Sequence, residues 1–252
     1  MKFQICLAMA MTTLLSLGHG YSARALAQRL VPQGWRVIGT TRSPAKAAEL
    51  HASGVTPLLL PGSLSAAIGA ATHILSSVAP DESGDPILRD HRAELSAARP
   101  EWAGYLSTTA VYGDHNGGWV DEQTPLAPTP RRGAARVLAE AEWTALGLPL
   151  HIFRLAGIYG PGRGPFEKVR DGTARRIVKP GQVFNRIHVE DIGRVTMLAA
   201  RQKLAGTFNL ADDEPAPPQD LVTYAAEKLG VPPPPETPFE TAQMTPMARS
   251  FY

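Results

Sequence analysis

Short apolar runs alternate with segments of helical periodicity over the first two thirds of the chain. Each apolar run predicts a buried strand, and the runs lie at residues 12–17, 35–40, 55–60, 73–78, 104–107 and 150–155. The segments between them carry apolar residues at helical spacing, at 22–33, 43–52, 64–71, 86–98 and 129–146. This alternation predicts βαβ units and therefore an α/β fold, a doubly wound parallel sheet with helices on both faces.

Capping residues mark where several of these helices begin and end. Ser43 and Pro44 suit the N-cap and first turn of the second helix, and Gly54 follows its end. Thr129 and Pro130 are expected to cap the long helix that precedes the last strand of the series.

The rhythm changes after residue 156, where glycine and proline gather over residues 157–165. A second, smaller lobe is expected to begin there. Within this lobe the pattern predicts a hairpin around Pro180–Gly181, a helix that opens near Val189, a strand at 207–210 and a helix at 218–229. The expected division is an N-terminal extension over 1–11, a sheet domain over 12–156, and mainly the smaller lobe over 157–252.

Composition and charge exclude several classes of protein. Of the 252 residues, 44% are hydrophobic and 19% charged, which is typical of a globular chain. The formal net charge of +2 is too small to indicate nucleic acid as a partner. Cys6 is the single cysteine, so an intrachain disulfide and a cysteine zinc site are excluded, no metal is expected, and a reducing, cytoplasmic location is favoured.

The amino terminus leaves one alternative open. Lys2 precedes a mostly apolar run over 3–17 that superficially has the pattern of a signal peptide. The run is too short and too interrupted by polar residues to span a bilayer, so no membrane is expected as a partner. Cleavage near Ala23–Ala27 would also remove a glycine loop, and the run is better used as a buried strand.

That glycine loop is the strongest local signal in the chain. Residues 18–23 follow the pattern G-x-G-x-x-A between a predicted strand and a predicted helix. Gly18 permits a tight turn, Gly20 lets the backbone approach a pyrophosphate, and Ala23 allows close packing of helix on strand. The helix N-terminus, which includes Tyr21 and Ser22, offers N–H groups to phosphates. A glycine-rich turn without a ligand is the alternative.

The residues after the second strand favour NADP over NAD. About 20 positions beyond the glycine loop, an NAD site would have Asp or Glu for the adenosine ribose. This chain has Thr41, Arg42 and Ser43 there, whose guanidinium and hydroxyl groups can bind a 2′-phosphate. The alternative is that Arg42 is a solvated loop charge.

Hydroxyl side chains also follow the fifth predicted strand, at Thr108 and Thr109. Ligands of open α/β sheets bind at the carboxyl ends of the strands, where a hydroxyl can bond a substrate oxygen. Such residues also serve simply as turn formers.

Five segments together carry a resemblance to a known family. They are the glycine loop, S-T-T-A-V-Y-G at 107–113, R-L-A-G-I-Y-G-P-G-R at 154–163, F-N-R-I-H-V-E-D-I at 184–192 and G-T-F-N-L-A-D-D-E-P at 206–215. With them the chain resembles the extended short-chain dehydrogenase/reductase superfamily, in particular its atypical NAD-dependent epimerase/dehydratase-like branch. The resemblance implies a Rossmann domain that binds a nicotinamide cofactor and a small C-terminal substrate-binding lobe, which in this chain would be truncated at its C-terminus. It also implies a homodimer as a candidate assembly.

The resemblance also implies roles for individual residues. Thr108 matches the family's catalytic Ser/Thr. The segment that passes the cofactor's ribose and pyrophosphate corresponds to Ser76, Ser77 and Val78. The segment near the nicotinamide corresponds to Leu155, Ala156, Gly157 and Ile158. Residues expected to contact the substrate are Thr109, Tyr159, Arg186 and His188.

One part of the family pattern is missing. The usual Tyr-x-x-x-Lys pair is replaced by Arg132 and Arg136, when the following Ala-Glu pair is aligned with the family's. Arg136 can still bind ribose hydroxyls, but Arg132 stays protonated and cannot exchange a proton near neutral pH. Arg132 would instead bind an anionic substrate group. The proton must then come from Tyr112, Tyr159, His188 or the substrate, and His188 has a structural role as its alternative.

The leading hypothesis is therefore an NADP-dependent oxidoreductase that acts on a small polar metabolite. A cofactor-binding redox sensor with little catalysis is the second hypothesis, and a sugar-nucleotide epimerase or dehydratase is the third.

Overall fold

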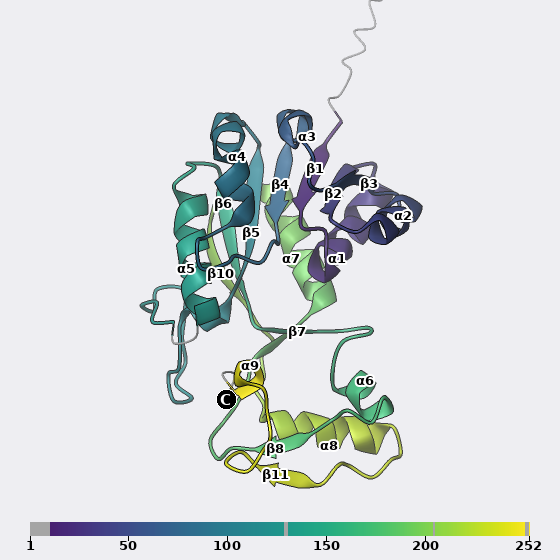
Figure 1. Ribbon diagram of the computed structural model, residues 1–252, viewed down its shortest axis with the longest axis vertical. Helices are drawn as coiled ribbons and strands as arrows, with labels where there is room; N and C mark the ends of the chain where they lie inside the picture. Colours follow the sequence, from purple (N-terminus) through teal and green to yellow (C-terminus); the bar gives the residue numbers. More distant parts are fainter. Residues whose placement is uncertain (1–10, 129–130, 204, 250–251) are drawn as a thin grey trace, which may run out of the picture.

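A seven-stranded sheet forms the centre of the protein (Figure 1). The computed structural model describes residues 11–128, 131–203, 205–249 and 252. Within the sheet, neighbouring strands are all parallel and follow the order β10-β6-β5-β4-β1-β2-β3. The strands are β1 (Thr13–Leu17), β2 (Arg36–Thr41), β3 (Thr56–Leu59), β4 (His73–Ser76), β5 (Trp102–Thr108), β6 (Leu150–Leu155) and β10 (Gly206–Leu210).

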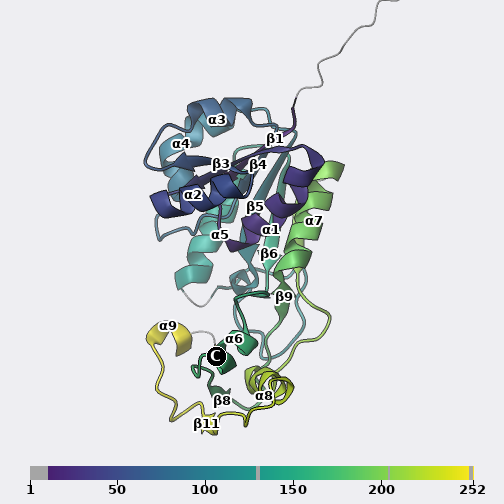
Figure 2. The same ribbon diagram turned by 90° about the vertical axis from the view of Figure 1, so that its right-hand side faces the viewer.

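Helices cover both faces of this sheet. They are α1 (Tyr21–Leu30), continued by the 3₁₀ turn Val31–Gln33, then α2 (Pro44–Ala52), α3 (Ser65–Ala70), α4 (Pro86–Ala97), α5 (Arg131–Thr144) and α7 (Val189–Gln202). One core cluster joins the sheet to α1, α2 and α7 through residues such as Leu26, Leu50 and Ile192. The other joins it to α3, α4 and α5, and Figure 2 shows the α1–α7 pair and α5 on opposite sides of the strands. The predicted doubly wound α/β fold is confirmed.

Local signals placed several elements accurately. Strand β6 has the predicted bounds, and α2 begins at Pro44, with the Ser43 hydroxyl accepting a hydrogen bond from the Lys46 N–H at 3.4 Å. The expected caps Thr129 and Pro130 lie outside the described residues, and so does most of the expected extension over 1–11.

The smaller lobe lies beyond the carboxyl ends of the strands (Figure 1). It contains α6 (Pro165–Arg170), β8 (Arg176–Val178), α8 (Pro218–Lys228), β11 (Glu236–Pro238) and α9 (Pro246–Arg249). A two-stranded parallel ribbon of β7 (Gly157–Tyr159) and β9 (Arg186–His188) connects the sheet to the lobe, and β8 pairs in parallel with β11. No helix of the described segments is both long and apolar enough to cross a membrane.

Two expectations about this lobe are wrong. A turn forms at Pro180–Gly181, but the strands on either side of it do not make a hairpin, because β8 pairs with β11 and β9 pairs with β7. The predicted helix near Val189 and strand at 207–210 exist as α7 and β10, yet both belong to the sheet layers, since β10 pairs with β6. Periodicity identifies an element, whereas its partner is set by contacts distant in sequence.

The close approach of α1 and α7 generates a stability prediction. A Cβ on Gly193 of α7 would lie 2.8 Å from the Ala25 carbonyl oxygen of α1, so we expect Gly193→Ala to force the helices apart and to cost about 1–3 kcal/mol of unfolding free energy. Urea denaturation measures this. Gly69→Ala in α3 is the matched control, because no atom lies within 4 Å of a Cβ there and alanine favours a helix. Equal effects of the two substitutions would contradict the prediction.

Candidate cofactor and substrate site

The glycine loop sits between the carboxyl ends of β2 and β4. Gly18 has φ +73°, and a Cβ on it would lie 2.8 Å from the Val78 Cγ2 atom, so both the turn and the packing require glycine. The Gly18 N–H donates to the Thr40 hydroxyl at 2.7 Å, and the Ser77 hydroxyl donates to the Gly18 carbonyl. The end of β2 and the segment that follows β4 therefore fix the loop, and Ser77 and Val78 lie against it.

The N-terminus of α1 opens from this loop without a capping side chain. Gly20 is the N-cap residue, no acidic residue lies in the first turn, and the nearest atom to a Cβ on Gly20 would be 3.7 Å away. Tyr21 and Ser22 begin the helix, and Ala23 is buried against the sheet as predicted. Open backbone N–H groups at a helix N-terminus beside a glycine turn fit a pyrophosphate.

His19, the residue between the two glycines, points into the core. Its Nδ1 atom lies 2.9 Å from the Ser16 hydroxyl oxygen, and a Cβ on Gly39 would lie 2.9 Å from its ring. Burial and, to a smaller extent, the charge of Arg24 together lower the pKa of His19 to about 4. The imidazole is therefore neutral near neutral pH and anchors the loop, a role that the sequence pattern did not indicate.

The residues predicted to select NADP lie together between β2 and α2. The Thr41 hydroxyl accepts from the Ser43 N–H at 3.2 Å, and Ser43 caps α2. Arg42 between them is exposed and makes no hydrogen bond or ion pair with the described part of the chain. Both hydroxyl groups keep a proton to donate, so all three side chains are available to a ligand.

Ser76, the remaining member of the β4 segment, faces the interior. It is fully buried, and its hydroxyl lies 3.5 Å from an oxygen of Asp85, the N-cap residue of α4. Burial raises the pKa of Asp85, whose carboxylate also accepts from the Trp143 indole at 2.7 Å. The Ser76 side chain is therefore turned into the protein toward α4 and away from solvent.

The strand end of β5 carries the predicted hydroxyl groups. Thr108 is half-buried, and its hydroxyl oxygen accepts from the Ala110 N–H at 3.2 Å, so it caps the 3₁₀ turn Thr109–Val111. Both Thr108 and Thr109 are partly accessible. The turn-forming role suggested by the sequence is present, and the Thr108 O–H remains free to donate to a substrate.

Arg136 reaches from α5 to these same strand ends. One nitrogen of its guanidinium donates to the Leu106 carbonyl at 2.8 Å, the Tyr105 hydroxyl at 3.0 Å and the Val78 carbonyl at 3.3 Å. Val78 also packs on Gly18, so Arg136 borders the glycine loop. Arg132, one turn earlier in α5, is exposed.

Tyr112 is not available as a proton donor. The side chain is 1% exposed, and its hydroxyl donates to the Asn209 side-chain oxygen at 2.7 Å while accepting from Arg154 at 2.9 Å. Arg154 in turn forms a buried ion pair with Glu140 at 2.8 Å. Tyr112 therefore belongs to a buried polar network, in which its hydroxyl is a hydrogen-bond partner of Arg154. The motif V-Y-G did not indicate this structural role.

The expected nicotinamide segment leads from β6 into the β7–β9 ribbon. Leu155 and Ala156 are buried, the Gly157 N–H donates to the Asn185 carbonyl at 3.1 Å, and Ile158 is partly buried. A Cβ on Gly157 would lie 3.3 Å from that same carbonyl oxygen. Backbone geometry thus places this segment at the junction of the sheet and the smaller lobe.

Three of the predicted substrate residues gather on the ribbon. The rings of Tyr159 and His188 are 5.1 Å apart, edge to face. His188 Nδ1 accepts from the Glu190 N–H at 3.3 Å and caps α7, which is the structural role left open by the sequence. Burial and a hydrogen bond with Asp212 raise the pKa of Tyr159. Arg186 donates to the carbonyls of Phe184 and Ala216 at 3.0 and 3.2 Å.

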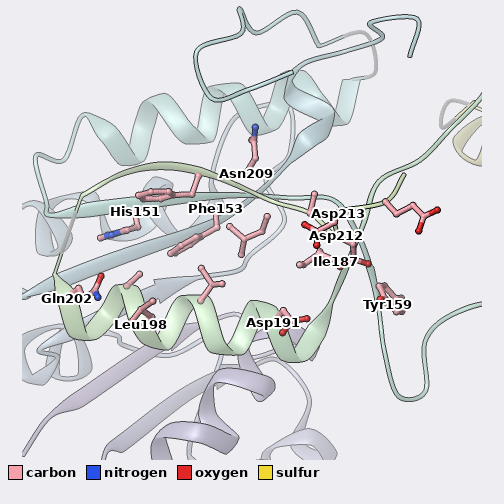
Figure 3. Close-up of a pocket in the computed structure, with 16 residues that line it drawn as sticks. His151, Phe153, Tyr159, Ile187, Asp191, Leu198, Gln202, Asn209, Asp212 and Asp213 are labelled. Atoms are coloured by element: carbon pink, nitrogen blue, oxygen red, sulfur yellow. The ribbon is translucent and has the colours of Figure 1, made fainter. Parts of the chain in front are cut away.

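A separate groove of about 850 Å³ lies between α7 and the strands β6 and β10 (Figure 3). His151 and Phe153 of β6 form part of its floor, and Leu198 of α7 its wall (Figure 3). Of the predicted site residues only Tyr159 lines it. The sequence did not indicate this groove, because it depends on β10 lying beside β6. Among the described residues no cluster of potential metal ligands occurs.

The sheet order together with the glycine turn between β1 and α1 defines a Rossmann-type protein. No family model matches the chain. Protein YeeZ of Escherichia coli (strain K12) is 33% identical over 241 residues, which cover 86% of this chain and 84% of YeeZ. The chain therefore belongs to the same family as YeeZ. A solved structure described as an NAD-dependent epimerase/dehydratase from Methylobacillus flagellatus, 25% identical with a TM-score of 0.70, has the same fold, in agreement with the resemblance to the extended short-chain dehydrogenase/reductase superfamily.

Other comparisons agree on the architecture. A functionally unknown conserved protein from Silicibacter pomeroyi DSS has a solved structure with a TM-score of 0.91 and 56% identity, covering 96% of this chain and 87% of that one. The 3-diazoavenalumate denitrifying reductase of a Streptomyces species is 32% identical over 130 residues, 46% of this chain and 42% of the reductase. Further solved structures, at 14 to 25% identity, share the fold with TM-scores from 0.70 to 0.74, and several of them hold NAD.

The buried imidazole of His19 generates a prediction about pH. Its pKa is about 4 in the folded protein against the ordinary value of 6.5 in the unfolded chain, so the unfolded chain takes up the proton first as the pH falls. Stability should therefore decrease below about pH 6.5, and His19 alone should account for about 2 kcal/mol of unfolding free energy between pH 7 and pH 5. Burial lowers the pKa of His73 and His151 in the same direction.

Urea denaturation across this pH range measures the effect. His19→Gln should be less stable at pH 7 but should show a flatter pH dependence, whereas His51→Gln, at an exposed position of α2, should keep the full slope. An unchanged slope in His19→Gln would contradict the assignment.

Proposed function

We propose that the protein is an NADP-dependent oxidoreductase that acts on a small, polar, anionic metabolite. The observation that carries this proposal is the glycine loop, in which Gly18 packs on Val78 and the uncapped N-terminus of α1 opens beside it. Family membership and the NAD-bound structures with the same fold support a nicotinamide cofactor. The partial relative that is a reductase supports redox chemistry.

The preference for NADP rests on Arg42. Its exposed guanidinium belongs to the residue between Thr41 and Ser43, the N-cap of α2, and no carboxylate occupies positions 40–43. A 2′-phosphate bound there would gain charge-assisted hydrogen bonds and would meet no negative side chain from these positions.

The chemistry would take place where β5 and β6 end. A nicotinamide bound at this edge supplies or accepts a hydride. The Thr108 O–H can donate to a substrate oxygen, and Arg136 holds the ends of β4 and β5 together beside it. Arg132 and Arg186 add positive charge for an anionic substrate group. With Tyr112 buried, Tyr159 and His188 are the remaining proton donors that the sequence suggested, and both lie at the junction of the lobes.

A redox sensor that binds NADP without turnover is the second candidate. It is favoured by Arg132 and Arg136, which the expected alignment of the Ala-Glu pair puts at the positions of the family's Tyr and Lys, since neither guanidinium can exchange a proton near neutral pH. Family membership fits an epimerase as well, although that reaction relies on the missing tyrosine.

Cofactor titration tests the NADP assignment. Purified protein should bind NADPH about 10- to 100-fold more tightly than NADH, as expected from one or two charge-assisted bonds. Arg42→Ala should remove this preference, while Arg36→Ala, at the exposed opposite end of β2, should keep it. Cofactor fluorescence measures both affinities, and equal affinity of the unaltered protein for NADH and NADPH would refute the assignment.

Turnover separates the enzyme from the sensor. We expect NADPH oxidation with at least one compound in a panel of carboxylate- or phosphate-bearing carbonyls and imines, and we expect Thr108→Val to reduce kcat without changing the affinity for NADPH. Absorbance at 340 nm reports NADPH oxidation. Tight NADPH binding without turnover across the panel would instead favour the sensor.

A further inference from the structure

The loop that follows β7 forms a tight hairpin at residues 160–163. Gly160 and Arg163 exchange two backbone hydrogen bonds, both of 2.9 Å, around Pro161 and Gly162. Gly160 and Gly162 have φ values of +148° and +72°, which glycine adopts readily. The proline and the closed turn restrict the conformations of this loop, so the direction of the Arg163 backbone is well defined.

This hairpin rests on the first residue of α1. The Tyr21 hydroxyl donates to the Pro161 carbonyl at 3.0 Å, and the guanidinium carbon of Arg163 lies 5.6 Å from the centre of the Tyr21 ring. A Cβ on Gly160 would lie 2.8 Å from the Tyr21 hydroxyl oxygen, so the contact also requires glycine. A segment of the smaller lobe is thereby held against the helix end that opens from the glycine loop.

Two sources of positive charge meet at this point. The N-terminus of α1 has neither a capping side chain nor an acidic residue in its first turn. Arg163 is exposed and makes no ion pair with the described residues, and the carboxylate of Glu167 in α6 acts electrostatically on Tyr21 in the direction opposite to Arg163. The backbone N–H groups of the helix end and the guanidinium can both bind an anion that lies between them.

We propose that Arg163 binds the pyrophosphate of the dinucleotide from the side opposite the glycine loop, so that the cofactor bridges the sheet domain and the smaller lobe. This inference rests on the proposed cofactor site and assigns a further residue to it. Tyr21 is a positioning residue, because its ring and hydroxyl hold the hairpin in place. Arg163 would then act on the pyrophosphate and not on the 2′-phosphate, which lies at Arg42.

Two fragments of NADP separate these contacts. ADP-ribose contains the pyrophosphate, whereas 2′-AMP contains the 2′-phosphate and no pyrophosphate. Calorimetric titration of the full chain should show that Arg163→Ala weakens ADP-ribose binding about tenfold and leaves 2′-AMP binding within twofold. Arg163→Lys should recover part of the affinity, because it restores the charge without the planar guanidinium.

The control and the contrary outcomes are distinct. Lys168→Ala removes a neighbouring exposed cation of α6 that makes no ion pair with the described residues, and it should leave both affinities unchanged. If the unaltered protein binds neither fragment, the proposed function itself fails. If it binds both, and Arg163→Ala binds ADP-ribose as well as the unaltered protein does, the assignment of Arg163 is wrong. An equal loss for both fragments would also overturn it, because it would indicate general damage to the site.

Discussion

The buried ion pair between Glu140 and Arg154 joins the elements on which the rest of the structure depends. The two side chains are 6 and 7% exposed and meet at 2.8 Å. Glu140 also accepts from the Ser107 hydroxyl, and Arg154 also donates to Tyr112, which donates to Asn209. Every charge in the network has a partner, which is the condition under which buried charges are tolerated. The network links α5, β5, β6 and β10 at the carboxyl end of the sheet.

Because the Glu140–Arg154 network lies at the carboxyl end of the sheet, it can set the geometry of the candidate site. Ser107 immediately precedes Thr108, and Arg154 immediately precedes Leu155, so the network fixes the last residue of β5 and of β6. Arg136 lies one helical turn before Glu140 on the same face of α5. Through its bonds to Leu106 and Val78 it holds the ends of β5 and β4. One helix therefore positions three adjacent strand ends where a cofactor and substrate would meet.

Local chemistry in the sequence predicted the elements and the cofactor loop better than it predicted their partners. The Ser43–Pro44 cap and the G-x-G-x-x-A turn are short-range signals, and the structure has α2 and α1 where they indicated. The positions of Tyr112 and His19 depend on Arg154 and Gly39, residues that only the folded chain brings near. The same reason explains the misassigned β10 and the unforeseen groove beside it.

The return of the chain to the sheet changes how the two lobes are connected. The chain leaves the sheet after β6, comes back through β9 to form α7 and β10, and then enters the smaller lobe again. The chain therefore passes between the sheet and the smaller lobe three times, at the carboxyl edge of the sheet. A simple division at residue 156 implies only one such passage. Two of these connecting segments, β7 and β9, are hydrogen-bonded to each other as a parallel ribbon. Because Gly160 follows β7 directly, this pairing limits where its hairpin can lie and brings that hairpin within contact of Tyr21.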